Sequence, residues 1–201
     1  LPLEPAQPDR RLAELVALAA PLLAISRTSL RARLPATLPV LDLDRDGPPA
    51  GAPAEPRRPA PPSTIAYIKF TSGSAGRPKP VAVSHANLAG LFDGITEALA
   101  LGPADAWSWF HSPAFGFEAW EVWGALTHGA CLVVVPEAAR RDPAQLADFL
   151  VDEGVTVFSQ TPSAWRLLLA SEAFHARVAG GRLRVVALSG EPLRDDDVRG
   201  W

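Results

Sequence analysis

The sequence contains a Ser- and Gly-rich stretch, Thr71-Ser72-Gly73-Ser74-Ala75-Gly76-Arg77-Pro78-Lys79. The apolar run Ile65 to Phe70 precedes it and predicts a strand, and Ser84-His85 follows it and predicts a helix start. Glycine lets a backbone approach a ligand closely, and successive N–H groups in such a turn form an anion-binding concavity. Three hydroxyls and the Lys79 ammonium add donors, so the loop suits a polyphosphate.

The spacing of this loop leaves a second interpretation open. It departs from the P-loop pattern G-x-x-x-x-G-K-[ST], because only two residues separate Gly73 from Gly76. A Ser- and Gly-rich run taken alone is more often a plain surface loop. The remainder of the chain must therefore decide between a phosphate-binding loop and a surface loop.

Composition excludes several classes of protein. The 201 residues carry a net charge of −3 without a long basic run, which argues against nucleic-acid and anionic-membrane partners. A single cysteine, Cys131, rules out an internal disulfide framework and favours a reducing, cytoplasmic compartment. The longest apolar run, Leu15 to Ile25, is too short to span a bilayer. Because the sequence contains no Met, we expect it to be an internal piece of a longer polypeptide.

The rest of the chain alternates predicted helices and strands, which predicts an α/β fold with layered, largely parallel sheets and flanking helices. Gly47 to Pro62 holds seven prolines and predicts a loop without regular structure. Strands are expected at 22–25 (buried), 40–43, 65–70, 107–111 (with Trp107, Trp109 and His111 on one face), 130–135 (buried) and 155–158. Helices are expected at 9–20 (capped by Asp9), at 84–99, around Trp120, Trp123 and Leu126 on a buried side, and from Asp142 and Thr161.

Four blocks together resemble the acyl-adenylate-forming superfamily. The Thr71–Lys79 stretch is similar to its phosphate loop T-S-G-S-T-G-x-P-K-G, and Phe115–Leu126 is similar to F-D-x-S-x-W-E. Val155–Ser163 resembles V-T-x-x-x-x-T-P-S, and Leu183–Leu193 resembles L-R-x-x-x-x-G-G-E-x-L. The resemblance covers the whole chain and is greatest to nonribosomal peptide synthetase adenylation domains, which implies one partial AMP-binding domain over 1–201, with the Pro-rich loop at 47–62 inside it.

The resemblance implies a reaction and a set of site residues. A carboxylate attacks the α-phosphorus of ATP to give an acyl-adenylate and pyrophosphate, and catalysis is mostly positioning and charge neutralisation. Lys79 is the implied catalytic residue. The implied contacts to the β- and γ-phosphates are Thr71, Ser72, Gly73, Ser74, Gly76 and Lys79, and those to adenine are Gly190, Glu191 and Pro192. The implied acyl pocket consists of Gly116, Phe117, Trp120, Ser159, Ala187 and Ser189, with His111 near its mouth.

Three positions depart from the family pattern. Ala75 replaces a Thr and Pro80 replaces a Gly in the phosphate loop, which is expected to weaken phosphate binding. Gly116 stands where adenylation domains for α-amino acids have an Asp that pairs with the substrate ammonium. A buried ammonium without a partner would cost several kcal/mol, so the resemblance implies an acid without a free α-amino group. The alternative is that Gly116 marks a decayed, inactive copy.

Other parts of the family pattern are absent from the sequence. The Y-G-P-T-E block that supplies a Mg²⁺ ligand and the lysine-bearing C-terminal subdomain would both follow Trp201, so no metal ligand is assigned here and the isolated chain is expected to be inactive. The implied acceptor is the phosphopantetheine thiol of a carrier-protein domain. An acyl-CoA or fatty-acyl-AMP ligase remains open, since Glu191-Pro192 gives the G-E-P form common in acyl-CoA synthetases. A non-catalytic remnant or interaction module remains open as well.

Overall fold

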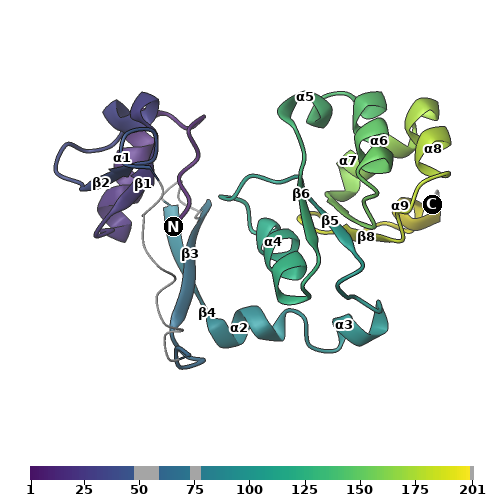
Figure 1. The fold of residues 1–201 in the computed structure, drawn as a ribbon, viewed down its shortest axis with the longest axis horizontal. Coiled ribbons are helices and arrows are strands. Elements are labelled where there is room, and N and C mark those ends of the chain that lie inside the picture. Colours follow the sequence, from purple (N-terminus) through teal and green to yellow (C-terminus); the bar gives the residue numbers. More distant parts are fainter. Residues whose placement is uncertain (48–58, 73–77, 200–201) are drawn as a thin grey trace. The chain divides into compact units, whose positions relative to one another are not determined.

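The computed structural model describes residues 1–47, 59–72 and 78–199, which form two compact units, Leu1–Ala89 and Gly90–Trp201 (Figure 1). Most of the predicted loop 47–62 therefore lies outside the described residues, and its described end, residues 59–62, is neither helix nor strand. No helix in the described part of the chain is long and apolar enough to cross a membrane. Each unit is built around its own sheets.

The described residues of the first unit form two α-helices, a 3₁₀ helix and two small sheets. Strands β1 and β2 pair in parallel, whereas β3 and β4 pair antiparallel. The helix that follows β4 belongs to this unit except for its last residue, Gly90. The elements are α1 (Asp9–Ala19), β1 (Ala24–Ser26), η1 (Thr28–Arg33), β2 (Val40–Asp42), β3 (Ile65–Ser72), β4 (Pro78–Ser84) and α2 (His85–Gly90).

Helix α1 has the predicted apolar face, with Leu12, Leu15 and Val16 buried. Its start differs from the prediction, because Pro8 occupies the cap position and Asp9 is already helical. The Asp9 carboxylate instead accepts a hydrogen bond of 2.7 Å from Nε of Arg33, at the end of η1. The expected buried strand at 22–25 is also wrong: β1 begins at residue 24, and the side chains of the described residues 22, 23 and 25 are largely exposed.

The segment after β3 forms a hairpin, so the predicted step from strand to loop to helix is wrong. The register pairs Ile68 with Ala82, Phe70 with Pro80 and Thr71 with Lys79. Helix α2 then begins after Ser84, whose Oγ accepts from the backbone N–H of Asn87 at 3.1 Å. The second strand was not predicted because it contains prolines, which are unfavourable within a sheet. A two-stranded sheet tolerates them, since both of its strands are edge strands.

The predicted helix over 84–99 is divided in two. Helix α2 ends at Gly90, a turn follows, and α3 (Ile95–Ala98) begins after Gly94. The φ angle of Gly94 is 75°, a left-handed conformation that glycine adopts without steric cost. Two glycines four residues apart thus override an otherwise continuous apolar periodicity.

The second unit is a four-stranded parallel sheet in the order β6-β5-β7-β8, covered by helices (Figure 1). This confirms the α/β class and the parallel sheet. Strand β7 begins two residues later than expected, and the sequence analysis predicted none of the helices α5, α8 and α9. The elements are β5 (Ala106–Trp109), α4 (Glu118–Thr127), β6 (Cys131–Val134), α5 (Glu137–Arg140), α6 (Pro143–Asp152), β7 (Val157–Gln160), α7 (Pro162–Leu169), α8 (Glu172–Val178), β8 (Val185–Leu188) and α9 (Asp195–Arg199).

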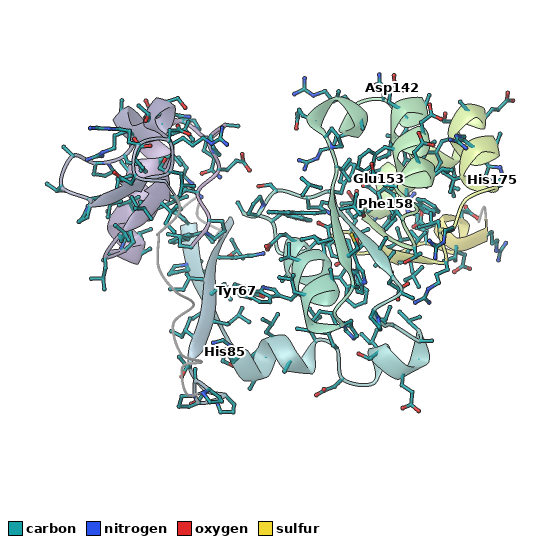
Figure 2. The ribbon with its side chains drawn as sticks, viewed as in Figure 1. Tyr67, His85, Asp142, Glu153, Phe158 and His175 are labelled. Atoms are coloured by element: carbon teal, nitrogen blue, oxygen red, sulfur yellow. The ribbon has the colours of Figure 1, made fainter. Side chains whose placement is uncertain are left out.

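Helices cover the two faces of this sheet unequally. Trp107 on β5 is fully buried against α4, where its ring centroid lies 4.9 Å from that of Trp120. Phe158 on β7 faces the other way, into a core formed with α6, α7 and α8 that includes Trp165 and Phe174 (Figure 2). Successive strand residues point to opposite faces, so β7 contributes Val157 to one layer and Phe158 to the other.

Helix α4 buries a different stripe from the one predicted. Trp120 is buried as expected, but Trp123 and Leu126 are 36% and 56% exposed. The buried stripe contains Glu121 and Gly124 instead. An added Cβ on Gly124 would lie 2.2 Å from Cζ3 of Trp107, so the indole ring occupies the space that a side chain on the helix would need. The glycine and the acidic residue made this stripe look polar in the sequence.

The caps of the second unit follow the prediction, whereas the burial of β6 does not. Strand β6 is an edge strand and is partly exposed rather than buried. Asp142 caps α6 by accepting from the N–H groups of residues 144 and 145, and Thr161 caps α7 (Figure 2 labels Asp142). Gly129 and Gly154 both have positive φ where they end helices. These residues confirm the predicted starts of α6 and α7 and the predicted ends of α4 and α6.

Candidate functional site

The predicted phosphate loop connects β3 to β4 at the end of the hairpin. Thr71 and Lys79 are directly opposite each other in the antiparallel register, and both are exposed. Opposed residues present their side chains on one face with Cβ atoms about 5 Å apart, so the Thr71 hydroxyl and the Lys79 ammonium share that face. A hydroxyl and a mobile cation side by side suit a phosphate oxygen.

Not all of the predicted loop can be placed. Gly73, Ser74 and Gly76 lie outside the described residues, and Ser72 is placed by its backbone alone. Lys69, two residues before Thr71, shares the face of Thr71 and has its Nζ 5.2 Å from the centre of the Tyr67 ring (Figure 2 labels Tyr67). The face therefore carries Lys69 as well as Lys79.

The carboxyl ends of the parallel strands in the second unit supply another set of predicted residues. The chain leaves β5 toward β6 on one side, and it leaves β7 toward β8 on the other. The two connections diverge between β5 and β7, and such a switch point is where open parallel sheets bind ligands. His111 follows β5 and Thr161 follows β7, which brings these two segments to the switch point.

His111 is held there by a buried carboxylate. Its Nδ1 lies 2.8 Å from Oε1 of Glu121, and its backbone N–H donates to Oε2 of the same residue at 3.1 Å. The Glu121 side chain is 0% exposed and that of His111 is 11% exposed. Glu121 belongs to the first turn of α4, where the helix dipole favours a negative charge. Both carboxylate oxygens are thus satisfied by a single residue.

Three phenylalanine rings surround the His111 ring. The ring centroid of Phe110 lies 5.3 Å from it, that of Phe115 lies 5.3 Å and that of Phe117 lies 5.2 Å. Phe115 in turn approaches Gly190 after β8: a Cβ built there would lie 3.3 Å from Cζ of Phe115. Gly190 has a φ angle of 92°, so both space and backbone conformation favour glycine at this position.

Glu191 is tied to the neighbouring loop. Its Oε1 accepts from Oγ of Ser163 at 2.7 Å, and its Oε2 accepts from the N–H of Ser163 at 3.0 Å. The side-chain hydrogen bond from Ser163 is the main reason that the pKa of Glu191 lies below its usual value, and the backbone N–H adds to it. The carboxylate therefore links the turn after β8 to the start of α7.

The structure places the remaining predicted residues separately. Gly116 is exposed, and nothing lies within 4 Å of the position of an added Cβ. Trp120, on the buried side of α4, packs against Phe92, and their ring centroids lie 5.6 Å apart. Ser159 is buried, Ala187 is half-buried, and Ser189 donates from its backbone to the carbonyl of Gln160 at 3.2 Å. Pro192 is exposed. The proposed roles of these residues remain predictions.

Glu121 was missed in the sequence, although it lies within the Phe115–Leu126 block. A glutamate one position after a buried tryptophan is unexpected in an apolar stripe. That anomaly is the sequence feature that could have indicated a role for Glu121. Among the described residues, no group of three or more His, Cys, Asp or Glu side chains could hold a metal ion.

Comparison with known proteins agrees with this arrangement. The whole chain, residues 1–201, matches the family described as AMP-binding enzyme. It is 40% identical to syringomycin synthase SyrB1 of Pseudomonas syringae pv. syringae over 203 residues, which cover 100% of this chain and 33% of that protein. It is 36% identical to a dimodular nonribosomal peptide synthase of Bacillus subtilis, covering 100% of this chain and 9% of that protein. The chain thus spans a third or less of these relatives.

The fold is also similar to solved structures. A crystal structure of the nonribosomal peptide synthetase FmoA3 matches with a TM-score of 0.82 and 30% identity, covering 98% of this chain and 21% of that one. The N-terminal subdomain of NpsA from Klebsiella oxytoca matches with a TM-score of 0.80 and 23% identity, covering 99% and 50%. The chain belongs to the AMP-binding enzyme family and corresponds to the N-terminal portion of nonribosomal peptide synthetase adenylation domains.

Proposed function

We propose that the protein containing this chain activates a carboxylic acid with ATP. The products would be an acyl-adenylate and pyrophosphate, and the acyl group would pass to the phosphopantetheine thiol of a carrier domain, in the cytoplasm. The observation that carries this proposal is the family match over the whole chain, together with a hairpin end that keeps Thr71 and Lys79 side by side.

The chemistry assigned to this chain is the binding of phosphate. A carboxylate attacking the α-phosphorus must displace pyrophosphate, and the charge that develops on the leaving group is stabilised by a nearby cation. Lys79 would supply that cation and Thr71 a hydrogen bond, while Gly190 to Pro192 would lie against the adenine. The Mg²⁺ ligand and the lysine near the reacting carboxylate would come from residues outside this chain, so we expect the isolated 201 residues to be inactive.

The proposed substrate is an acid that lacks a free α-amino group. Gly116 offers no carboxylate for an ammonium, and the space beside it is open. Solved relatives are described with both kinds of ligand: NpsA was crystallised with 3-hydroxybenzoyl-AMSN, and FmoA3 with α-methyl-L-serine-AMP. An unpaired ammonium would cost several kcal/mol when buried, which favours the NpsA kind of substrate for this chain.

Exchange of radiolabelled pyrophosphate into ATP tests this proposal on the protein that contains the chain. The acids would be paired by structure, such as L-phenylalanine with 3-phenyllactate and 4-aminophenylalanine with 4-hydroxyphenyllactate, alongside benzoates and fatty acids. We expect exchange with acids that lack the α-amino group and none with the isolated 201 residues. No exchange with any acid would favour a non-catalytic remnant, and preference for amino acids would contradict the assignment of Gly116.

The acceptor is tested separately. Incubation of the acyl-adenylate with either a phosphopantetheinylated carrier domain or free coenzyme A, followed by mass spectrometry, identifies the thioester formed. We expect the carrier to be loaded, since the relatives reported above are peptide synthetases. Loading of coenzyme A alone would indicate the alternative, an acyl-CoA ligase.

A further inference from the structure

We infer that Glu121 is a positioning residue that fixes the ring of His111, and that His111 Nε2 contacts a hydroxyl group on the acyl part of the substrate. This inference rests on the proposed function, because it assumes that the acid lies at the carboxyl end of β5. It adds a role for Glu121 that the sequence did not indicate, and it restricts the substrate to hydroxylated acids.

The first step concerns the orientation of the ring. Glu121 accepts from both the backbone N–H and the ring Nδ1 of His111, so the imidazole is held at two points. A carboxylate that is ionised can only accept, which means that Nδ1 carries the proton in this pair. A buried hydrogen bond of this kind selects one tautomer and one ring orientation.

The second step concerns the opposite ring nitrogen. Within the part of the chain that the structure describes, Nε2 of His111 has no hydrogen-bond partner. The His111 side chain is only 11% exposed, and phenylalanine rings flank its imidazole. A polar atom in such surroundings loses free energy unless a ligand or water supplies its partner. His111 therefore presents one polar atom within an apolar aromatic wall at the switch point.

The third step concerns the chemistry of the ligand. The neutral ring accepts at Nε2, and the protonated ring donates there. A hydroxyl group can satisfy either state because it both donates and accepts, whereas an alkyl chain satisfies neither. The phenylalanine rings suit the apolar body of the acid. The site thus fits a hydroxylated acid with an aromatic or alkyl body, in agreement with the absence of an ammonium partner at Gly116.

The kinetic test compares Glu121→Gln with the unaltered protein that contains the chain. The glutamine amide can accept one hydrogen bond with its oxygen, but its NH₂ group cannot accept the second. We expect KM for the acid in pyrophosphate exchange to rise about tenfold, with KM for ATP changed less than about twofold. Glu137→Gln is the matched control, since Glu137 is exposed and pairs with Arg141 on the surface, and it should leave both constants unchanged.

The specificity test compares acids that differ by one hydroxyl, namely 3-hydroxybenzoate with benzoate and 3-phenyllactate with 3-phenylpropanoate. We expect the hydroxylated member to be favoured at least about tenfold in kcat/KM, and His111→Phe to abolish this preference. Equal use of both members by the unaltered protein would overturn the hydroxyl contact. An equal rise of both KM values in Glu121→Gln would mean that Glu121 acts only through the fold.

A third measurement does not depend on activity. Long-range proton–nitrogen NMR on histidine-labelled protein reports which ring nitrogen carries the proton, and the chain has four histidines to assign by substitution. We expect Nδ1–H for His111 and an altered pattern in Glu121→Gln. If no acid supports exchange, the proposed function fails, and the substrate contact fails with it. The NMR result still decides whether Glu121 fixes the His111 ring. An Nε2–H tautomer would overturn the ring orientation.

Discussion

The hairpin end and the carboxyl edge of the four-stranded sheet are built in opposite ways. At the hairpin end, Thr71 and Lys79 are exposed and are aligned only by the register of two strands. At the sheet edge, His111 is held by the buried Glu121, and Glu191 is tied to Ser163 across 28 positions in sequence. The first region presents exposed donors, and the second presents groups held by tertiary contacts.

The two regions therefore suit different roles. Exposed donors on a two-stranded hairpin can follow a phosphate chain as it moves, whereas fixed groups can discriminate between acids by shape and hydrogen bonding. We therefore expect substitutions in the hairpin to change activity without changing stability. Substitutions around the sheet should change stability or the choice of acid.

The largest effect is expected for Lys79→Ala in the protein that contains this chain. Removing one cation that stabilises developing charge typically lowers the rate by about 100-fold, and we expect that loss in pyrophosphate exchange. The melting temperature should stay unchanged, because Lys79 is exposed. Lys69→Ala, on the same face but farther from the loop, is the control and should cost less than about threefold. Equal losses in both variants would show that only the general positive charge matters.

Gly124→Ala should give the largest effect on stability in the second unit. The added methyl group would overlap the Trp107 ring, and overpacking of this kind costs about 1–3 kcal/mol. The favourable helix propensity of alanine offsets about 1 kcal/mol of that cost, so a net loss of about 2 kcal/mol is the upper expectation in urea unfolding.

Gly116→Ala is the control for this substitution. Its added methyl group meets nothing within 4 Å, and the free energy of unfolding should change by less than about 0.5 kcal/mol. If both alanine variants were equally stable, the packing of α4 against β5 would differ from the arrangement described above.

The smallest effect concerns the pH dependence of the link between Glu191 and Ser163. The hydrogen bonds from Ser163 lower the pKa of Glu191 in the folded state, so the stabilisation is complete above the ordinary carboxyl value of about 4.3. It is lost as the pH falls below that value toward the lowered pKa. Ser163→Ala should reduce the dependence of unfolding free energy on pH between pH 5 and about pH 2, compared with the unaltered chain. Identical pH profiles would remove this link from the account.

Local chemistry predicted much of the fold. Asp142 and Thr161, each followed by proline, marked the starts of α6 and α7, and Gly129 and Gly154 marked helix ends. The apolar periodicity of α1 was equally clear. These signals depend on neighbouring residues alone, and they therefore survive without knowledge of the tertiary structure.

The errors arose where distant residues decide the structure. Strand β4 contains Pro78 and Pro80, and only its pairing with β3 makes it a strand. The buried stripe on α4 depends on the Trp107 ring of β5, which leaves space only for glycine at position 124. Glu121 is buried in the same stripe. The sequence could thus suggest candidate residues for phosphate binding, but it could not reveal the buried partner of His111.

The central claim is that this is an adenylation domain for an acid without an α-amino group, and Gly116→Asp tests it most directly. The measurement is the ratio of kcat/KM for 3-phenyllactate to that for L-phenylalanine in pyrophosphate exchange, before and after the substitution. We expect a ratio above one for the unaltered protein, and a fall of at least about tenfold with Asp, whose side chain has room and would pair with the ammonium. A ratio below one in the unaltered protein, or one that Asp leaves unchanged, would contradict it.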